Sequence, residues 1–163
     1  MIIIRKAAPG VSEQALSRFA QRARRAAGLR GQVNVLLTSS RDLRALNRRF
    51  RGKDKPTDVL SFPPVPMVAD AFSGDIVIST EIACRNARRY QHAPAQELKI
   101  LILHGMLHLA GYDHESDRGE MARREEGLRR ELGLGNGLIG RTAKGCGAGP
   151  RPAPHQQSRR RAR

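Results

Sequence analysis

The sequence predicts an α+β fold, a single domain in which a small mixed β-sheet carries packed helices. Short apolar runs rich in β-branched residues alternate with amphipathic helical patterns, in the order β-α-β-α-β-β-α-α-α. The length of 163 residues is that of one domain that can bury a core. One helical segment is much more apolar than the others, and we expect it to be the central, buried helix.

Two strands and two helices are expected in the first 50 residues. Ile2–Ile4 is typical of a short strand, and Ser12 can cap a helix that ends near Gly28. Gln32–Thr38 is a second β-rich run, and Ser39 or the serine after it can cap the next helix. The apolar positions recur at three- and four-residue spacing in both helices: Ala15, Leu16, Phe19, Ala20 and Ala23, then Leu43, Leu46 and Phe50.

The middle and the end of the chain continue this alternation. Arg51–Asp58 is expected to be a charged loop, because it contains both Gly and Pro. Val59–Phe62 and Gly74–Ser79 have the composition of strands, and Thr80–Gln91 that of a helix. A last helix is expected over Glu115–Leu132, with its apolar positions turned inward and its many charges outward.

The most apolar helix carries a histidine motif. Three of the five histidines of the chain lie within the eleven residues from His104 to His114. On a helix, His104 and His108 leave the same face about 6 Å apart, which suits two nitrogen ligands of one metal ion. Gly111 can end the helix at a positive φ and return His114 towards the same ion. The spacing therefore predicts a metal site.

The spacing of this motif is also that of the metzincin metalloproteases, with one departure. In that class a glutamate follows the first histidine and serves as general base, whereas this chain has Gly105. Structural zinc normally takes four protein ligands, and catalytic zinc takes three and a water. The motif supplies three, and Cys84 or Asp113 can complete a structural set only if the fold brings it close. A catalytic metal without protease chemistry is the favoured interpretation.

Charge points to a polyanionic partner. The formal net charge is +15 and the pI is about 11.4, which favours nucleic acid. Seven of the basic residues lie after residue 136, and removing them from the +15 leaves +8 for residues 1–136. We expect residues 1–137 to form the domain and 138–163 a disordered basic tail, since apolar periodicity stops there. With four Phe, two Tyr and no Trp, base stacking is not expected to be a major mode of binding.

The two cysteines are far apart in sequence, which indicates no disulfide framework and suits a reducing compartment. The apolar run at the N-terminus is too short for a signal peptide, and no stretch is long enough to span a bilayer. These observations predict a cytoplasmic protein without a membrane partner.

The residues around the histidines resemble the signature of a known family. The motif His104-Gly105-x-Leu107-His108-Leu109-x-Gly111-Tyr112-Asp113-His114 is similar to that of the bacterial YbeY proteins, metal-dependent endoribonucleases of ribosomal RNA maturation. Residues 51–63 (RGKDKPTDVLSFP) and 74–78 (GDIVI) are similar to two other segments of the family. The resemblance covers roughly residues 30–133, and the tail lies outside it.

The resemblance implies an activity and its residues. One zinc ion per chain is expected on His104, His108 and His114, with Arg51 and His114 as catalytic residues. Lys53 and Lys55 are candidates for binding the RNA backbone. The implied function is single-strand-specific, zinc-dependent cleavage in rRNA maturation at the 3′ end of 16S rRNA, and in ribosome assembly and quality control. The implied partners are rRNA, the ribosome or small-subunit proteins, and assembly factors.

Two alternatives remain open from the sequence. One is a non-catalytic ribosome assembly factor with a structural zinc, which the basic charge supports equally well. The other is a metzincin-like metalloprotease, which the histidine spacing favours and Gly105 disfavours.

Overall fold

A four-stranded mixed sheet lies at the centre of the structure. The computed structural model describes residues 1–65, 71–114 and 117–134. The strands are β1 (Ile2–Ile4), β2 (Gln32–Thr38), β3 (Val59–Phe62) and β4 (Phe72–Ser79). They lie in the order β1-β2-β4-β3, in which β1, β2 and β4 are parallel and β3 is antiparallel to β4. The predicted α+β class with a mixed sheet is confirmed.

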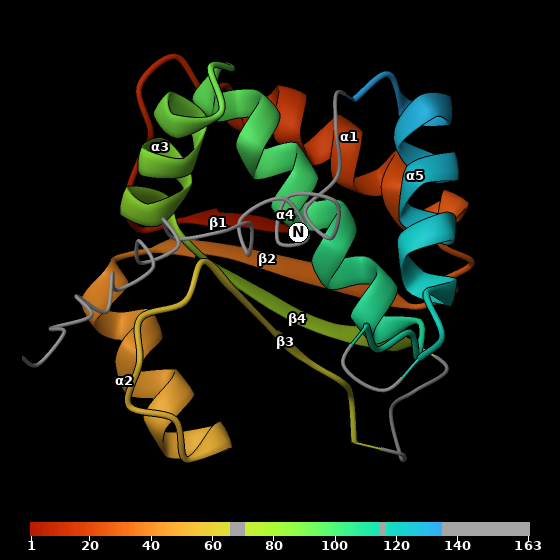
Figure 1. Ribbon diagram of the computed structural model, residues 1–163, viewed down its shortest axis with the longest axis horizontal. Coiled ribbons are helices and arrows are strands. Elements are labelled where there is room, and N and C mark those ends of the chain that lie inside the picture. Colours follow the sequence, from red (N-terminus) through yellow and green to blue (C-terminus); the bar gives the residue numbers. More distant parts are fainter. Residues whose placement is uncertain (66–70, 115–116, 135–163) are drawn as a thin grey trace, which may run out of the picture.

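Helices cover both faces of this sheet. Inward residues of β2 and β4, such as Val35 and Ile76, pack in one apolar cluster with four of the helices. The alternate residue Val77 packs in a second, small cluster with Leu43 of the remaining helix. Figure 1 shows the helices of the larger group mostly above the strands and the remaining helix below them. The helices are α1 (Glu13–Ala26), α3 (Thr80–Arg89), α4 (Pro94–Leu109) and α5 (Glu120–Leu132) on one face, and α2 (Ser40–Arg51) on the other.

The predicted central helix is α4. It crosses the sheet diagonally between α3 and α5 (Figure 1), and every residue from Leu98 to Leu107 except Lys99 is buried. Pro94 occupies its first turn, where the missing N–H costs nothing. After the helix, Gly111 has a φ of 92°, the left-handed conformation predicted for the turn. Among the described residues, no helix combines the length and apolar character needed to cross a bilayer.

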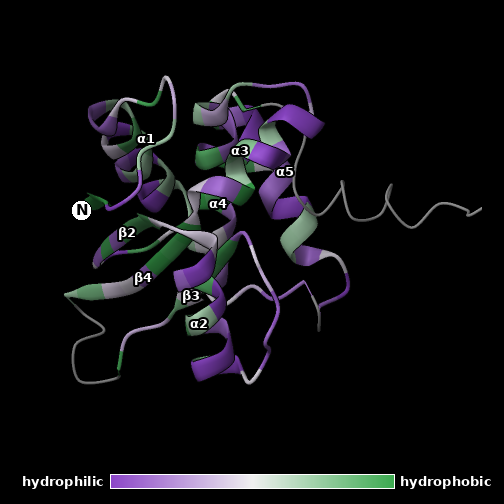
Figure 2. Cartoon of the chain, turned by 90° about the vertical axis from the view of Figure 1, so that its left-hand side faces the viewer, coloured by the Kyte–Doolittle hydropathy of each residue, from purple (hydrophilic) through white to green (hydrophobic). Residues whose placement is uncertain are grey.

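In contrast to α4, the helices on the surface are mostly hydrophilic. Figure 2 shows α1, α2 and α5 as mostly hydrophilic, around apolar strands and the apolar α4. Each of these helices turns a narrow stripe of apolar side chains towards the core. Leu16 of α1 and Leu128 of α5 belong to such stripes, and both are 1% exposed. The amphipathic pattern therefore predicts correctly which helices lie outside.

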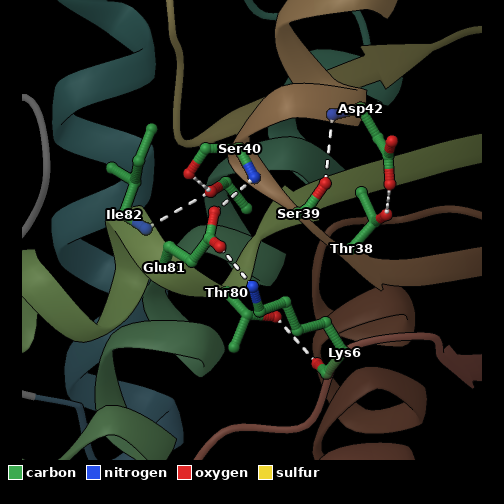
Figure 3. Close-up of polar contacts among 9 residues, drawn as sticks. Lys6, Thr38, Ser39, Ser40, Asp42, Thr80, Glu81 and Ile82 are labelled. Atoms are coloured by element: carbon green, nitrogen blue, oxygen red, sulfur yellow. Dashed lines mark hydrogen bonds and ion pairs between the residues drawn. The ribbon is translucent and has the colours of Figure 1, made fainter.

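Helices α2 and α3 begin side by side at the ends of β2 and β4 (Figure 3). Ser39 Oγ accepts a hydrogen bond from the backbone N–H three residues later at 3.1 Å, and Ser79 Oγ does the same for α3 at 3.2 Å. The carboxylate of Glu81 binds both the Lys6 ammonium and the backbone N–H of Ser40. These two contacts lower the pKa of Glu81 to about 2. The contact with Ser40 ties the start of α2 to α3.

Three details differ from the sequence-based expectation, and a fourth lies outside the described residues. Strand β4 begins at Phe72 rather than Gly74, and α5 begins at Glu120 rather than Glu115. Phe50, expected in the apolar stripe of α2, is 57% exposed. The expected tail over 138–163 lies outside the described residues, as does residue 137.

Candidate metal centre and its cavity

Three imidazoles converge at the C-terminal end of α4. His104 and His108 lie one turn apart on the helix, and His114 returns to them after the turn at Gly111. One ring nitrogen of each lies within 4.8 Å of the others, and the Nε2 atoms of His104 and His108 are 3.2 Å apart. Tetrahedral zinc with nitrogen ligands at 2.0–2.1 Å needs about 3.3 Å between the nitrogens. This histidine cluster (His104, His108 and His114) therefore fits a single ion.

A buried carboxylate of α5 orients the first histidine. Nδ1 of His104 lies 3.0 Å from Oε2 of Glu125, which is 1% exposed. An ionised carboxylate only accepts hydrogen bonds, so Nδ1 carries the proton and Nε2 presents its lone pair to the other histidines. Arg129, 2% exposed, places Nη1 3.9 Å from the other oxygen of Glu125. This buried cation favours the charged form of Glu125, which is the form that accepts from His104.

The second histidine is held in its neutral form. Burial, followed by the neighbouring His104 and His114, lowers the pKa of His108 to about 4. A metal ion requires the unprotonated imidazole, so His108 is ready to ligate near neutral pH without first losing a proton.

The cluster opens into a cavity of about 700 Å³, called here the site cavity. It lies between the end of α4 and the opposite edge formed by the end of α2 and the start of β3. The fold thus brings Arg51, the last residue of α2, to the same cavity as the three histidines. Its lining residues are Phe50, Arg51, Thr57–Pro63, His104, His108, Leu109, Gly111–His114.

The other candidate residues do not all line this cavity, and none of them belongs to the histidine cluster. Lys53 and Lys55 are exposed on the neighbouring loop and are not among the residues that line it. Asp113 lines the cavity but is not part of the three-ligand cluster within the described residues. Cys84 packs against the main apolar core and also stands outside that cluster. A fourth protein ligand of the kind considered from the sequence is therefore absent from the cluster in the described part of the chain.

The loop that follows Arg51 is held by side chains of α2. Arg44 binds both carboxylate oxygens of Asp54, at 2.8 and 3.1 Å, and the amide of Asn47 donates to the carbonyl of Lys55 at 2.8 Å. Arg44 is thus engaged by Asp54 of the loop. The side chain of Arg51 makes no hydrogen bond or ion pair with another described residue, and it lines the site cavity.

Asp58 lines the cavity and was not among the site residues predicted from the sequence. Its Oδ1 accepts from the backbone N–H of Val59 at 2.9 Å, and Asn86 donates to Oδ2 at 3.4 Å. Burial raises the pKa of Asp58, while the nearby His104 acts in the opposite sense. A half-buried carboxyl that resists ionisation, facing three histidines, can hold a proton or accept one. Neither Asp58 nor Glu125 carries a local sequence signal, because each acquires its role from a neighbour distant in the chain.

The packing of Gly105 explains why no glutamate follows His104. A Cβ atom here would lie 2.9 Å from Cγ2 of Ile76 and 3.0 Å from Oγ of Ser61. That hydroxyl also donates to the Gly105 carbonyl at 3.1 Å. Position 105 therefore faces the sheet at close approach, and a metzincin-type general base has no room there.

Comparison with known proteins agrees with this geometry. A family model described as "Endoribonuclease YbeY" matches residues 4–133. The chain is 59% identical over 144 residues to a protein of Koribacter versatilis named "Endoribonuclease YbeY", covering 88% of this chain and 93% of the relative. A protein of the same name from Solibacter usitatus is 44% identical over 140 residues, covering 86% and 92%. The solution structure of TM1509 from Thermotoga maritima is similar with a TM-score of 0.54 and 29% identity, covering 95% of this chain and 100% of that one.

Proposed function

Because this chain belongs to the YbeY family of endoribonucleases, we propose that it cleaves single-stranded RNA with one zinc ion held by His104, His108 and His114. The observation that carries this proposal is the placement of the three imidazoles and Arg51 around one cavity of about 700 Å³. A bound zinc ion supplies Lewis-acid chemistry to a phosphodiester and makes a nearby water more acidic. The surrounding side chains bind the phosphate, orient the metal ligands and transfer protons.

Arg51 is the proposed binding group for the scissile phosphate. Its position at the end of α2 is supported by the contacts at the start of the helix and by the Arg44–Asp54 pair, which joins the helix to the following loop. The planar guanidinium can donate to two phosphate oxygens at once, which a lysine cannot do. Negative charge grows on these oxygens during attack on phosphorus, so a fixed cation favours the transition state over the ground state.

Two carboxyl groups have separate proposed roles. Glu125 keeps His104 in the tautomer that binds metal and acts only through that histidine. Asp58 shares the cavity with the reacting groups, and its raised pKa suits proton transfer to or from a water or a leaving oxygen. His114, the exposed member of the cluster, is a proposed ligand that also lines the cavity, where it can contact a substrate.

The proposed biological substrate is ribosomal RNA. The +15 net charge supports a polyanionic partner, and Lys53 and Lys55 on the exposed loop beside the cavity can contact the backbone of the strand. We place the reaction in the cytoplasm, at the 3′ end of 16S rRNA and in the assembly and quality control of ribosomes. Small-subunit proteins or assembly factors are the proposed partners that direct so small an enzyme to its cleavage site.

The two alternatives fit the site less well. A structural zinc normally has four protein ligands, whereas the cluster offers three imidazoles that open into a cavity. A metalloprotease of the metzincin type needs the glutamate that the packing around Gly105 excludes. We therefore expect the purified protein to leave casein uncut.

The test combines metal analysis with an RNA cleavage assay. Purified protein should contain about one zinc per chain and should cut a single-stranded RNA, and a chelator should abolish cleavage. His108→Ala should lose most of the metal and the activity, while His92→Ala, a histidine outside the cluster, should keep both. Full zinc content in His108→Ala would refute the metal assignment. Zinc-loaded protein that never cuts RNA would favour the assembly-factor alternative.

A further inference from the structure

The exposed ring of Phe50 is out of place in the amphipathic pattern of α2. The earlier apolar positions of that stripe pack against the sheet, Leu43 being fully buried, but Phe50 is 57% exposed. Of the six Phe and Tyr residues of the chain, only Phe50 and Tyr90 are exposed. An exposed phenyl ring forgoes the stabilisation that burial would give, so its position calls for another explanation.

Phe50 lies at the mouth of the site cavity, next to the proposed phosphate-binding arginine. Both Phe50 and Arg51 line that cavity, together with Phe62 at the end of β3. The rings of Phe50 and Phe62 meet edge to face, with centroids 5.3 Å apart and planes inclined by 72°. Phe62 is half-buried against the small apolar cluster under α2. This contact braces the orientation of the exposed ring from the protein side.

Planar and positive groups surround the exposed ring. The guanidinium of Arg49 lies 5.2 Å from the centroid of the Phe50 ring. Arg48, Arg51 and Lys53 are exposed in the same stretch of chain. A planar apolar surface framed by cations matches a nucleotide, whose base has a π face and whose phosphate is negative. A nucleotide carries both features in one repeating unit, and the positive charges do not favour a purely apolar ligand.

We propose that Phe50, braced by Phe62, is a stacking platform for one nucleobase adjacent to the phosphate that Arg51 binds. This inference rests on the proposed function, because it places the RNA strand in the site cavity. The platform contributes affinity and fixes the register of the strand, but it reads no base identity, since every base has a π face. One ring holds one base, so phosphate contacts still supply most of the binding, as the few aromatic residues of the chain predict.

A fluorescence titration tests stacking without requiring cleavage. The probe is a short single-stranded RNA with 2-aminopurine at one position, and the full chain is stripped of metal so that the probe stays intact. Stacking on Phe50 should quench the probe, and Phe50→Ala should lose that quenching and bind roughly 5- to 100-fold more weakly. Phe50→Tyr should retain wild-type binding. Phe50→Leu, which keeps apolar bulk without a π face, should resemble Phe50→Ala.

The matched control is Tyr90→Ala. Tyr90 is 37% exposed and has the guanidinium of Arg89 5.6 Å from its ring centroid, but it does not line the site cavity. This variant should bind and quench as the wild type does. Equal losses in Tyr90→Ala and Phe50→Ala would overturn a specific platform, as would wild-type binding by Phe50→Leu.

A second measurement changes the RNA instead of the protein. A single abasic position, moved along the probe, should weaken wild-type binding most at one nucleotide, and Phe50→Ala should be insensitive to that same change. Equal sensitivity of both proteins would overturn the proposal. A wild-type protein that quenches the probe yet cuts no RNA with any metal would refute the proposed nuclease activity and leave the platform standing.

Discussion

His104 Nδ1 and Glu125 Oε2 are 3.0 Å apart, and this contact joins the metal-site helix α4 to α5 across 21 residues of sequence. Both side chains are buried, at 7% and 1% exposure. A hydrogen bond from Nδ1 to a carboxylate fixes the ring orientation and makes Nε2 a better donor to a metal. We therefore expect Glu125 to raise the affinity of the histidine cluster for the proposed zinc ion without touching that ion.

Replacing Glu125 by Gln should lower zinc affinity by about 10- to 100-fold, because the amide retains the shape but removes the negative charge behind His104. Chelator competition measures the affinity, and urea unfolding of the metal-free variant shows whether the fold persists. Glu126→Gln changes an exposed acid one residue away on the same helix and should leave affinity unchanged. Wild-type zinc affinity in a folded Glu125→Gln protein would contradict the positioning role.

Arg51→Ala should reduce the single-turnover rate of RNA cleavage by roughly 10²–10³-fold, the loss typical for one transition-state donor. Zinc content should stay at the wild-type level, because Arg51 is not a ligand. Arg51→Lys should recover little, since a point charge cannot replace the two-pronged contact. Arg22→Ala removes an equal charge from the exposed face of α1 and serves as the control. If Arg51→Ala cleaves at the wild-type rate, a different cation binds the scissile phosphate.

Gly105→Ala should destabilise the protein by about 1–3 kcal/mol, because the new methyl group overlaps Ile76 and Ser61. Gly127→Ala provides the opposite case, since a Cβ in that helix meets nothing within 4 Å. It should stabilise the protein by about 0.5–1 kcal/mol through helix propensity alone. Urea unfolding of the metal-free proteins measures both. An equal gain in stability for the two variants would show that α4 does not pack closely on the sheet at Gly105.

Acid should destabilise the metal-free protein through His108. Its pKa is lowered from 6.5 to about 4 in the folded state, so between these values the unfolded chain binds a proton that the native protein does not. The free energy of unfolding therefore rises with pH across this window and falls as acid is added. The carboxylate of Glu81 has a pKa lowered from 4.5 to about 2, so the free energy of unfolding falls further as the pH drops below 4.5.

The measurement is urea unfolding of metal-free wild type and His108→Gln at intervals from pH 4.5 to 8. The wild type should gain more stability than the variant between pH 4.5 and 6.5, and the two curves should run parallel above pH 7.5. Identical slopes below pH 6.5 would mean that His108 titrates normally in the folded protein.

Local patterns were sufficient for the order of the elements and for the convergence of three histidines that could hold a metal ion. Helix geometry alone places His104 and His108 on one face, and a glycine at position 111 permits the turn that returns His114. Side chains that cap their own helix, such as Ser39, act over three residues and are visible in the same way. These features depend on neighbours along the chain, so they can be predicted before the fold is known.

The tertiary structure decided what surrounds those ligands. The antiparallel β3 beside β4, and α2 on the face of the sheet opposite α4, bring Arg51 to the histidines. Packing of α5 on α4 places Glu125 behind His104, and the close approach of α4 to the sheet requires glycine at position 105. The same pattern that buries Leu43 leaves Phe50 exposed. Each of these outcomes depends on which segment lies opposite, and a single sequence does not encode that information locally.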